Sequence, residues 1–140
     1  MIIDPVRRLS VIAAGVHDAT LVEAVLDAPY AAVWKLAGDL EEGVPRFEPS
    51  VAAVQIVERA GERLRIVVQT ARGLHIPMAV VLRDGYCLMQ SPEVSIGMAA
   101  RAEGDKTRFA HFESLPGHSM PREELIKELQ MLEKLARANA

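Results

Sequence analysis

The sequence predicts an α+β fold in which one curved antiparallel sheet is covered by a long C-terminal helix. Three observations predict it. An alternating segment, Thr20–Leu26, gives way abruptly to a short helical pattern at Ala28-Pro29. Six further alternating segments follow from residue 51 onward, joined by short glycine- or proline-containing links. The one long amphipathic pattern covers residues 121–139. A sheet of seven strands with a single long helix over its open face is the arrangement that accommodates all three.

The first predicted element is a short helix over residues 5–14. Asp4 is a suitable N-cap, Pro5 suits the first helical position, and Gly15 can end the helix. Its apolar residues form one stripe: Val6, Leu9, Ile12 and Ala13. We expect residues 1–18 to be an N-terminal extension to a domain at 19–140, packed either on that domain or against a partner, including a second copy in a homodimer.

The first predicted strand is Thr20–Leu26, which Ala28-Pro29 ends because proline donates no ladder hydrogen bond and restricts the residue before it. A helix is predicted from Pro29 to Leu36. Gly38 breaks it, and a brief second helical turn is expected before Pro45.

From residue 51 the hydrophobic period is two, as in half-buried strands. The predicted strands are residues 51–57, 64–70, 74–82, 86–91, 94–100 and 107–115. The links between them hold two or three residues around Gly61, Gly73, Gly85, Pro92 and Gly104. Such links cannot hold a crossover helix, so the strands are predicted to run antiparallel in sequence order.

The C-terminal pattern predicts a helix of roughly 27 Å, at 1.5 Å per residue, which is long enough to cross a curved sheet. Its apolar face is predicted to hold Leu125, Ile126, Leu129, Leu132, Leu135 and Ala136. Glu123 and Lys127 form a favourable pair four residues apart on its flank.

Composition excludes several classes of function. The chain has 140 residues, 50% of them hydrophobic and 25% charged, with a net charge of −3. This balance offers no basic surface for nucleic acid or anionic lipid. No apolar run approaches the roughly 18 residues of a membrane span, so no integral membrane segment is expected. A single cysteine, Cys87, excludes an internal disulfide. A cytoplasmic protein is the expectation.

Several short motifs resemble those of a known family. They are Leu26-Asp27-Ala28-Pro29 followed by Ala32-Val33-Trp34 and the segment from Leu36 to Leu40; Phe47-Glu48-Pro49-Ser50-Val51; and Thr107-Arg108-Phe109 with the terminal helix after it. Over about residues 19–138 the chain resembles the SRPBCC superfamily, also called START-like or birch-pollen-allergen-like. Within it, the chain is most similar to the polyketide cyclase/dehydrase and lipid-transport branch. The resemblance implies a helix-grip fold whose cavity, between sheet and long helix, binds hydrophobic ligands, sometimes with cyclisation or dehydration of a polyketide.

Charged residues fix which side of each strand faces the core, because an unpaired buried arginine is costly. Placing Arg65, Arg83 and Arg101 in solvent turns the alternate apolar residues inward. The predicted ligand-binding set on the sheet and terminal helix is Leu64, Ile66, Val68, Ile76, Met78, Val80, Ile96, Met98, Phe109, Leu125, Leu129 and Leu132.

The last strand supplies the candidate catalytic residues. With Arg108 outward, His111 and Glu113 point inward and Phe112 points outward; a one-residue bulge would reverse this. An imidazole and a carboxyl in one apolar cavity could orient a polar ligand group or act as acid and base, with Tyr86 as a possible third member. The alternative is a structural histidine near the cavity mouth, bonded to water or to Tyr86.

No metal site or cofactor is predicted. The four histidines, His17, His75, His111 and His118, lack the spacing of metal ligands on one helix or turn. Cys87 has no activating neighbours in sequence and is expected to be a small buried hydrophobe. The glycines lie at hairpin turns and form neither a phosphate loop nor a dinucleotide fingerprint.

Three functions remain open from the sequence. The first is binding or carriage of a small hydrophobic molecule of lipid, polyketide or isoprenoid type, without catalysis. The second is a cyclase- or dehydratase-like enzyme that uses His111 and Glu113. The third is an interaction module that self-associates through the helix at 5–14.

Overall fold

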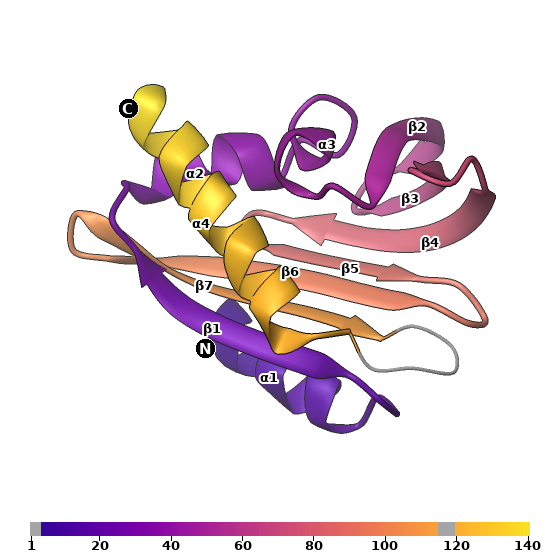
Figure 1. Cartoon of the computed structure of the whole chain (residues 1–140), viewed down its shortest axis with the longest axis horizontal. Helices are drawn as coiled ribbons and strands as arrows, with labels where there is room; N and C mark the ends of the chain where they lie inside the picture. Colours follow the sequence, from indigo (N-terminus) through magenta and orange to yellow (C-terminus); the bar gives the residue numbers. More distant parts are fainter. Residues whose placement is uncertain (1–3, 115–119) are drawn as a thin grey trace.

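The computed structural model describes residues 4–114 and 120–140 and contains one curved antiparallel sheet (Figure 1). The seven strands lie in the order β1-β7-β6-β5-β4-β3-β2, so β1 pairs with the last strand and β2 forms the opposite edge. The strands are β1 (Thr20–Leu26), β2 (Val51–Ala60), β3 (Arg63–Thr70), β4 (His75–Arg83), β5 (Tyr86–Gln90), β6 (Ser95–Glu103) and β7 (Lys106–Ser114). All pairs are antiparallel, as predicted.

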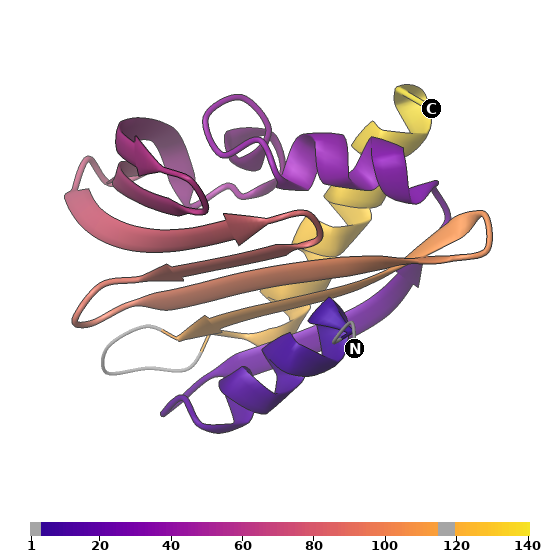
Figure 2. The same cartoon turned by 180° about the vertical axis from the view of Figure 1, so that it is seen from behind.

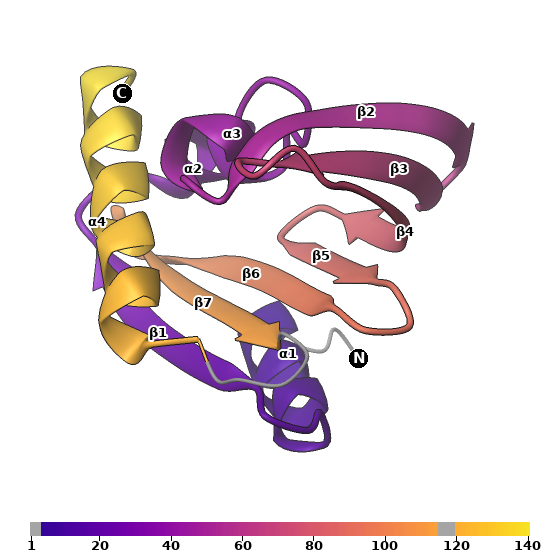
Figure 3. The same cartoon turned by 45° about the vertical axis from the view of Figure 1, so that its right-hand side comes forward.

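Helices lie on both faces of the sheet. The inner, concave face is covered by α2 (Tyr30–Ala37), α3 (Val44–Phe47) and α4 (Arg122–Ala138). Figure 3 shows α4 standing beside α2 and α3 with the sheet curving away from it. The start of α4 is tied to β1, because Thr20 Oγ1 donates to the Met120 carbonyl at 2.8 Å and Arg122 donates to the Leu21 carbonyl at 2.8 Å.

On the outer face, α1 (Pro5–Ala14) covers the part of the sheet around β6 and β7, as the view from behind shows (Figure 2). Asp4 caps α1 by accepting from the Val6 amide at 2.9 Å, and its carboxylate lies 3.0 Å from Arg101 on β6. Leu9 packs over Gly97, where a Cβ would lie 2.6 Å from Leu9 and 2.2 Å from Phe112. The apolar stripe of α1 therefore contacts the sheet of its own chain.

Register places one row of side chains across the inner face. His111 lies opposite Val22 on one side and Met98 on the other. Met98 in turn lies opposite Cys87, which lies opposite Leu82. Because successive residues of a strand face opposite sides, the neighbouring row of Ala110, Ala99 and Tyr86 belongs to the outer face under α1.

The predicted architecture is confirmed, with small differences in its elements. Ile126 was expected on the buried side of α4 but is 39% exposed, because it lies on the edge of a stripe centred on Leu125, Leu129 and Leu132. The second helical turn, α3, starts after Gly43 and includes Pro45, which suits an early helical position. The predicted end of the last strand, residue 115, lies outside the described residues. None of the described helices is long and apolar enough to cross a membrane.

Candidate functional site

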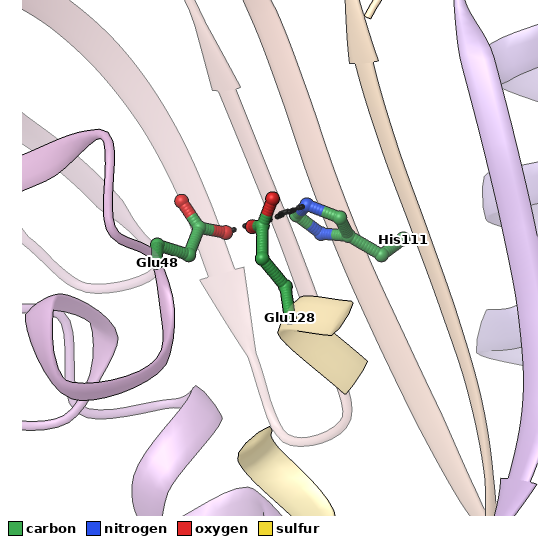
Figure 4. Close-up of side chains that lie close together, drawn as sticks. All are labelled: Glu48, His111 and Glu128. Atoms are coloured by element: carbon green, nitrogen blue, oxygen red, sulfur yellow. Dashed lines mark ion pairs between the residues drawn. The ribbon is translucent and has the colours of Figure 1, made fainter. Parts of the chain in front are cut away.

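Four ionisable side chains meet on the inner face, where two of them project from β7. Glu48 is 0% exposed, His111 1%, Glu113 2% and Glu128 5%. Glu48 follows α3, His111 and Glu113 come from β7, and Glu128 comes from α4. We call these four residues the Glu/His cluster. Figure 4 shows Glu48, His111 and Glu128 pointing toward one another from three separate elements.

Local structure fixes the position of each member. His111 and Glu113 are two residues apart on β7, so they face the same side of the sheet. Glu128 lies three residues after Leu125 and four before Leu132, which puts it on the buried stripe of α4. Glu48 is held at the end of α3, where its amide donates to the Val44 carbonyl at 3.0 Å and its carbonyl accepts from the Val51 amide at 3.0 Å.

The imidazole is the centre of the cluster. Its Nε2 lies 3.4 Å from Glu48 Oε1, 3.5 Å from Glu113 Oε2 and 3.6 Å from Glu128 Oε1. None of these contacts has the geometry of a hydrogen bond. Both oxygens of Glu48, both ring nitrogens of His111, Glu113 Oε2 and Glu128 Oε1 find no hydrogen-bond partner among the described residues. Buried polar atoms are nearly always paired, so this concentration of unpaired ones marks the cluster as unusual.

Burial and mutual charge shift the protonation of the cluster. Burial raises the pKa of Glu48 well above its usual value, and the nearby Glu113 and Glu128 carboxylates add to the rise while His111 opposes it. The pKa of Glu128 is raised, mainly by burial. For His111, burial favours the neutral ring, but the Glu113, Glu128 and Glu48 carboxylates together hold its pKa well above the usual value. The cluster therefore retains protons that solvent-exposed groups would lose.

The cluster has an excess of negative charge. One imidazolium can compensate one of three carboxylates, and the rest must hold protons or receive positive charge from outside the side chains. Such a site can bind a polar ligand group, exchange protons with a substrate, or hold a cation. Ligand atoms of Glu48, His111 and Glu128 all lie within 4.8 Å of one another.

The structure places the predicted ligand-binding set on the inner face of the sheet and on the side of α4 that faces it. All twelve belong to the main core, with Ile76 only partly buried. Phe109, two residues before His111 on β7, is fully buried beside the cluster. The position fits the predicted role, and the role itself stays a prediction.

Tyr86 does not join the cluster, and its predicted partnership with His111 is wrong. Its ring lies on the outer face, where the Arg8 guanidinium of α1 sits 5.3 Å from the ring centre. The register explains this, because Tyr86 lies opposite Ala99 in the outward row, whereas Cys87 shares the inward row with His111. Cys87 itself is fully buried, and burial with the nearby Glu48 charge raises its pKa to about 12.

Glu48 and Glu128 were not among the predicted site residues. A signal for Glu128 exists in the sequence, because its spacing from Leu125 and Leu132 puts a carboxylate within an apolar helix face. Glu48 lies in a turn between α3 and β2, and no periodicity indicates where a turn residue points. His118 lies outside the described residues.

Four hollows of 310–380 Å³ are lined by described residues, and none of the four is lined by the cluster. The one of 380 Å³ borders the inner face, since Trp34, Ile56 and Leu82 line it and also pack against the main core. Lys35 and Arg59 also line it. Leu82 shares the cross-sheet row of His111 but lies three strands away, about 14 Å at normal strand spacing.

Comparisons of sequence find no matching family model and no matching curated protein. Solved structures do match in three dimensions. A Zhui aromatase/cyclase from Streptomyces sp. R1128 is 13% identical with a TM-score of 0.63, covering 86% of this chain and 94% of the other. A START superfamily protein from Mycobacterium smegmatis is 14% identical with a TM-score of 0.54, covering 86% and 95%. The chain has the helix-grip fold.

A third protein with the helix-grip fold, TTHA0849 from Thermus thermophilus, is 20% identical with a TM-score of 0.64, covering 87% of this chain and 99% of that one. These structures confirm the predicted helix-grip fold, and membership of the SRPBCC superfamily stays a prediction. At these identities the helix-grip fold identifies the scaffold, and chemistry must be argued from the cluster.

Proposed function

We propose that this chain binds a small hydrophobic molecule that carries a polar group, held between the inner face of the sheet and α4. The observation that supports the proposal is an apolar inner surface interrupted by four buried ionisable side chains, six of whose polar atoms find no hydrogen-bond partner in the described part of the chain. Small-molecule sites commonly combine apolar walls with a few convergent polar groups in this way. A lipid, polyketide or isoprenoid with a hydroxyl, carbonyl or carboxyl group matches both features.

The energetic cost of burying unpaired polar atoms favours a bound ligand. A buried polar atom without a hydrogen bond costs about 1–3 kcal/mol, and charged groups cost more. The cluster contains at least six such atoms in Glu48, His111, Glu113 and Glu128. A ligand group that donates to the carboxylates or accepts from the imidazole would recover part of this cost. The aromatase/cyclase and START-superfamily neighbours use the same scaffold.

A cytoplasmic location also remains a proposal.

The test is recovery of a bound molecule. We expect native mass spectrometry of the gently purified full chain to show an added mass, and solvent extraction to release a hydrophobic compound. Glu113→Gln should reduce retention or rebinding of that compound at least tenfold, whereas Glu103→Gln, on the exposed side of β6, should not. If the wild type carries no compound and binds no fluorescent fatty-acid probe saturably, the proposal fails.

A second candidate function is acid–base catalysis of a cyclase- or dehydratase-like reaction. The observation that favours it is the 3.5 Å contact between His111 Nε2 and Glu113 Oε2 in a buried site. With Tyr86 on the outer face, His111 and Glu113 are the residues of the predicted trio that remain. A β-hydroxy thioester is a suitable probe. We expect His111→Gln to abolish its dehydration while still binding it; turnover that survives His111→Gln would contradict the candidate.

The self-association alternative is not proposed. It was based on the apolar stripe of the N-terminal helix, and that stripe, with Val6, Leu9 and Ala13, is buried against β6 and β7 of the same chain.

A further inference from the structure

We infer that Glu48, His111 and Glu128 bind one divalent first-row transition-metal ion, with Glu113 lying beside the site. This inference goes beyond the proposed function, because it does not depend on a hydrophobic molecule being bound. It also differs from the expectation of no metal site, which was based on spacing along the chain. The ligands come from a turn, a strand and a helix, so no sequence motif joins them.

The distances from His111 Nε2 to the carboxylates match the separation between two ligands of one tetrahedral ion. Two ligand atoms that each lie about 2.1 Å from such an ion are about 3.4 Å apart. His111 Nε2 lies 3.4, 3.5 and 3.6 Å from the nearest oxygens of Glu48, Glu113 and Glu128. These separations are long for charge-assisted hydrogen bonds, which are about 2.7–2.9 Å. They are the separations expected between ligands that share a metal.

Burial and charge point to a cation independently of these distances. Glu48 is completely buried and neither of its oxygens has a hydrogen-bond partner among residues 4–114 and 120–140. Both nitrogens of His111 are equally unpaired, so Nε2 is available as a ligand. Three carboxylates around a neutral imidazole carry a charge of −3, of which a divalent ion compensates two. The same atoms that are costly in isolation become ligands when the ion is present.

The types of ligand atom narrow the choice of metal ion. One imidazole nitrogen with carboxylate oxygens suits Zn²⁺, Fe²⁺ or Mn²⁺, whereas Ca²⁺ and Mg²⁺ prefer oxygen alone. Cys87 lies in the same cross-sheet row as His111 but two strands away, so thiolate ligation is not part of the site. A metal on Nε2 would also prevent His111 from exchanging a proton there, so metal binding and the acid–base role of His111 are alternatives.

The test uses metal alone. The full chain, freed of metal with a chelator and carrying no polyhistidine tag, is titrated with Zn²⁺ by calorimetry and with Co²⁺ by visible absorption. We expect one saturable site per chain and the intense ligand-field bands of four-coordinate Co²⁺. Glu48→Gln and Glu128→Gln should each weaken binding at least tenfold. Glu124→Gln, an exposed change on the same helix, is the matched control and should bind as the wild type does.

The inference is overturned if the wild type shows no saturable binding, if both cluster variants bind like the wild type, or if Glu124→Gln weakens binding equally. Circular dichroism checks that each variant folds. Should both cluster variants unfold, X-ray absorption of the wild-type Co²⁺ protein decides, because the site requires one imidazole among oxygen ligands and no sulfur. Binding of the hydrophobic probe is measured separately in chelator, so failure of the metal site leaves the proposed function standing.

Discussion

The two faces of the sheet differ in how their charged side chains are stabilised. On the outer face, Arg108 contacts Glu23 at 2.8 Å and Glu103 at 3.1 Å, with all three side chains partly exposed to water. On the inner face, His111 lies at 3.4–3.6 Å from three buried carboxylates without a well-formed hydrogen bond. Outer-face charges are stabilised by solvent and by one another. Inner-face charges are cut off from solvent, and one imidazole is shared among three carboxylates, which is why we assign function to the inner face.

The largest expected effect comes from removing the positive partner of the inner cluster. In metal-free protein, His111→Leu should lower the free energy of unfolding by about 3–5 kcal/mol, because it leaves buried carboxylates without compensation. Denaturant titration in chelator measures this. Glu48→Leu is the matched change and should be neutral or stabilising, since it removes excess negative charge. A His111→Leu variant as stable as the wild type would show that the cluster is not charged.

The next effect tests whether α1 is part of the fold. Leu9 is fully buried between α1 and the sheet, so Leu9→Ala should lower the free energy of unfolding by about 2–5 kcal/mol. Val11 is 68% exposed on the same helix, and Val11→Ala is the control, expected within about 0.5 kcal/mol of the wild type. Equal stabilities of the two variants would mean that α1 detaches in solution.

A pH titration of the wild type measures how the buried groups of the inner face contribute to stability. The folded-state pKa values of Glu48, Glu128 and His111 are all raised, so the folded protein binds more protons than the unfolded chain above about pH 4.5 for the glutamates and about 6.5 for the histidine. Stability from these groups is therefore greatest at acid pH and falls as pH rises. We expect Tm in chelator to be higher at pH 5.5 than at pH 8.

Glu48→Gln removes one of the raised groups, and its Tm should vary less over the same pH range. Glu103→Gln on the outer face should leave the pH dependence as in the wild type. If Tm of the wild type rises toward pH 8, the inner cluster does not retain protons in the folded state.

The smallest effect concerns Asp4, which both caps α1 and pairs with Arg101. Asp4→Ala should cost about 1 kcal/mol through loss of the cap. Asp4→Asn keeps a capping oxygen and should cost less than the alanine change, with the difference between aspartate and asparagine shrinking as salt is added. If the two variants are equally destabilised, the stability that Asp4 contributes comes from its ion pair with Arg101 and not from the cap.

The fold could be predicted largely from local pattern. Alternation between residues 51 and 114, Ala28-Pro29 and the stripe of α4 each depend on neighbours in sequence. The direction of His111 and Glu113 also followed from alternation once Arg108 was placed in solvent, and β7 has no bulge to reverse it. The strand ends differ by a few residues at most, because frayed ends have weak signals.

The complete site could not be predicted in the same way. Glu48 and Glu128 reach His111 only through tertiary packing, in which α3 contacts β2 and α4, and α4 contacts β1. Residues so far apart in the chain leave no shared spacing. For Tyr86 the error was the reverse, because the prediction included a residue that does not belong to the cluster. Its pairing with His111 was inferred from residue type, whereas the register from β5 through β6 to β7 puts the two side chains on opposite faces.

The strand order has a consequence for how the chain folds during synthesis. β1 is made before the other strands but its ladder partner is β7, with Thr20 opposite Glu113, so β1 stays unpaired until β7 has been made. The hairpins from β2 to β7 contain only local links and can form first. During that interval the apolar stripe of α1, which needs β6 and β7, has nothing to cover it. The vulnerable species on the ribosome is therefore a partial hairpin sheet that still lacks β6 and β7, beside an exposed N-terminal segment.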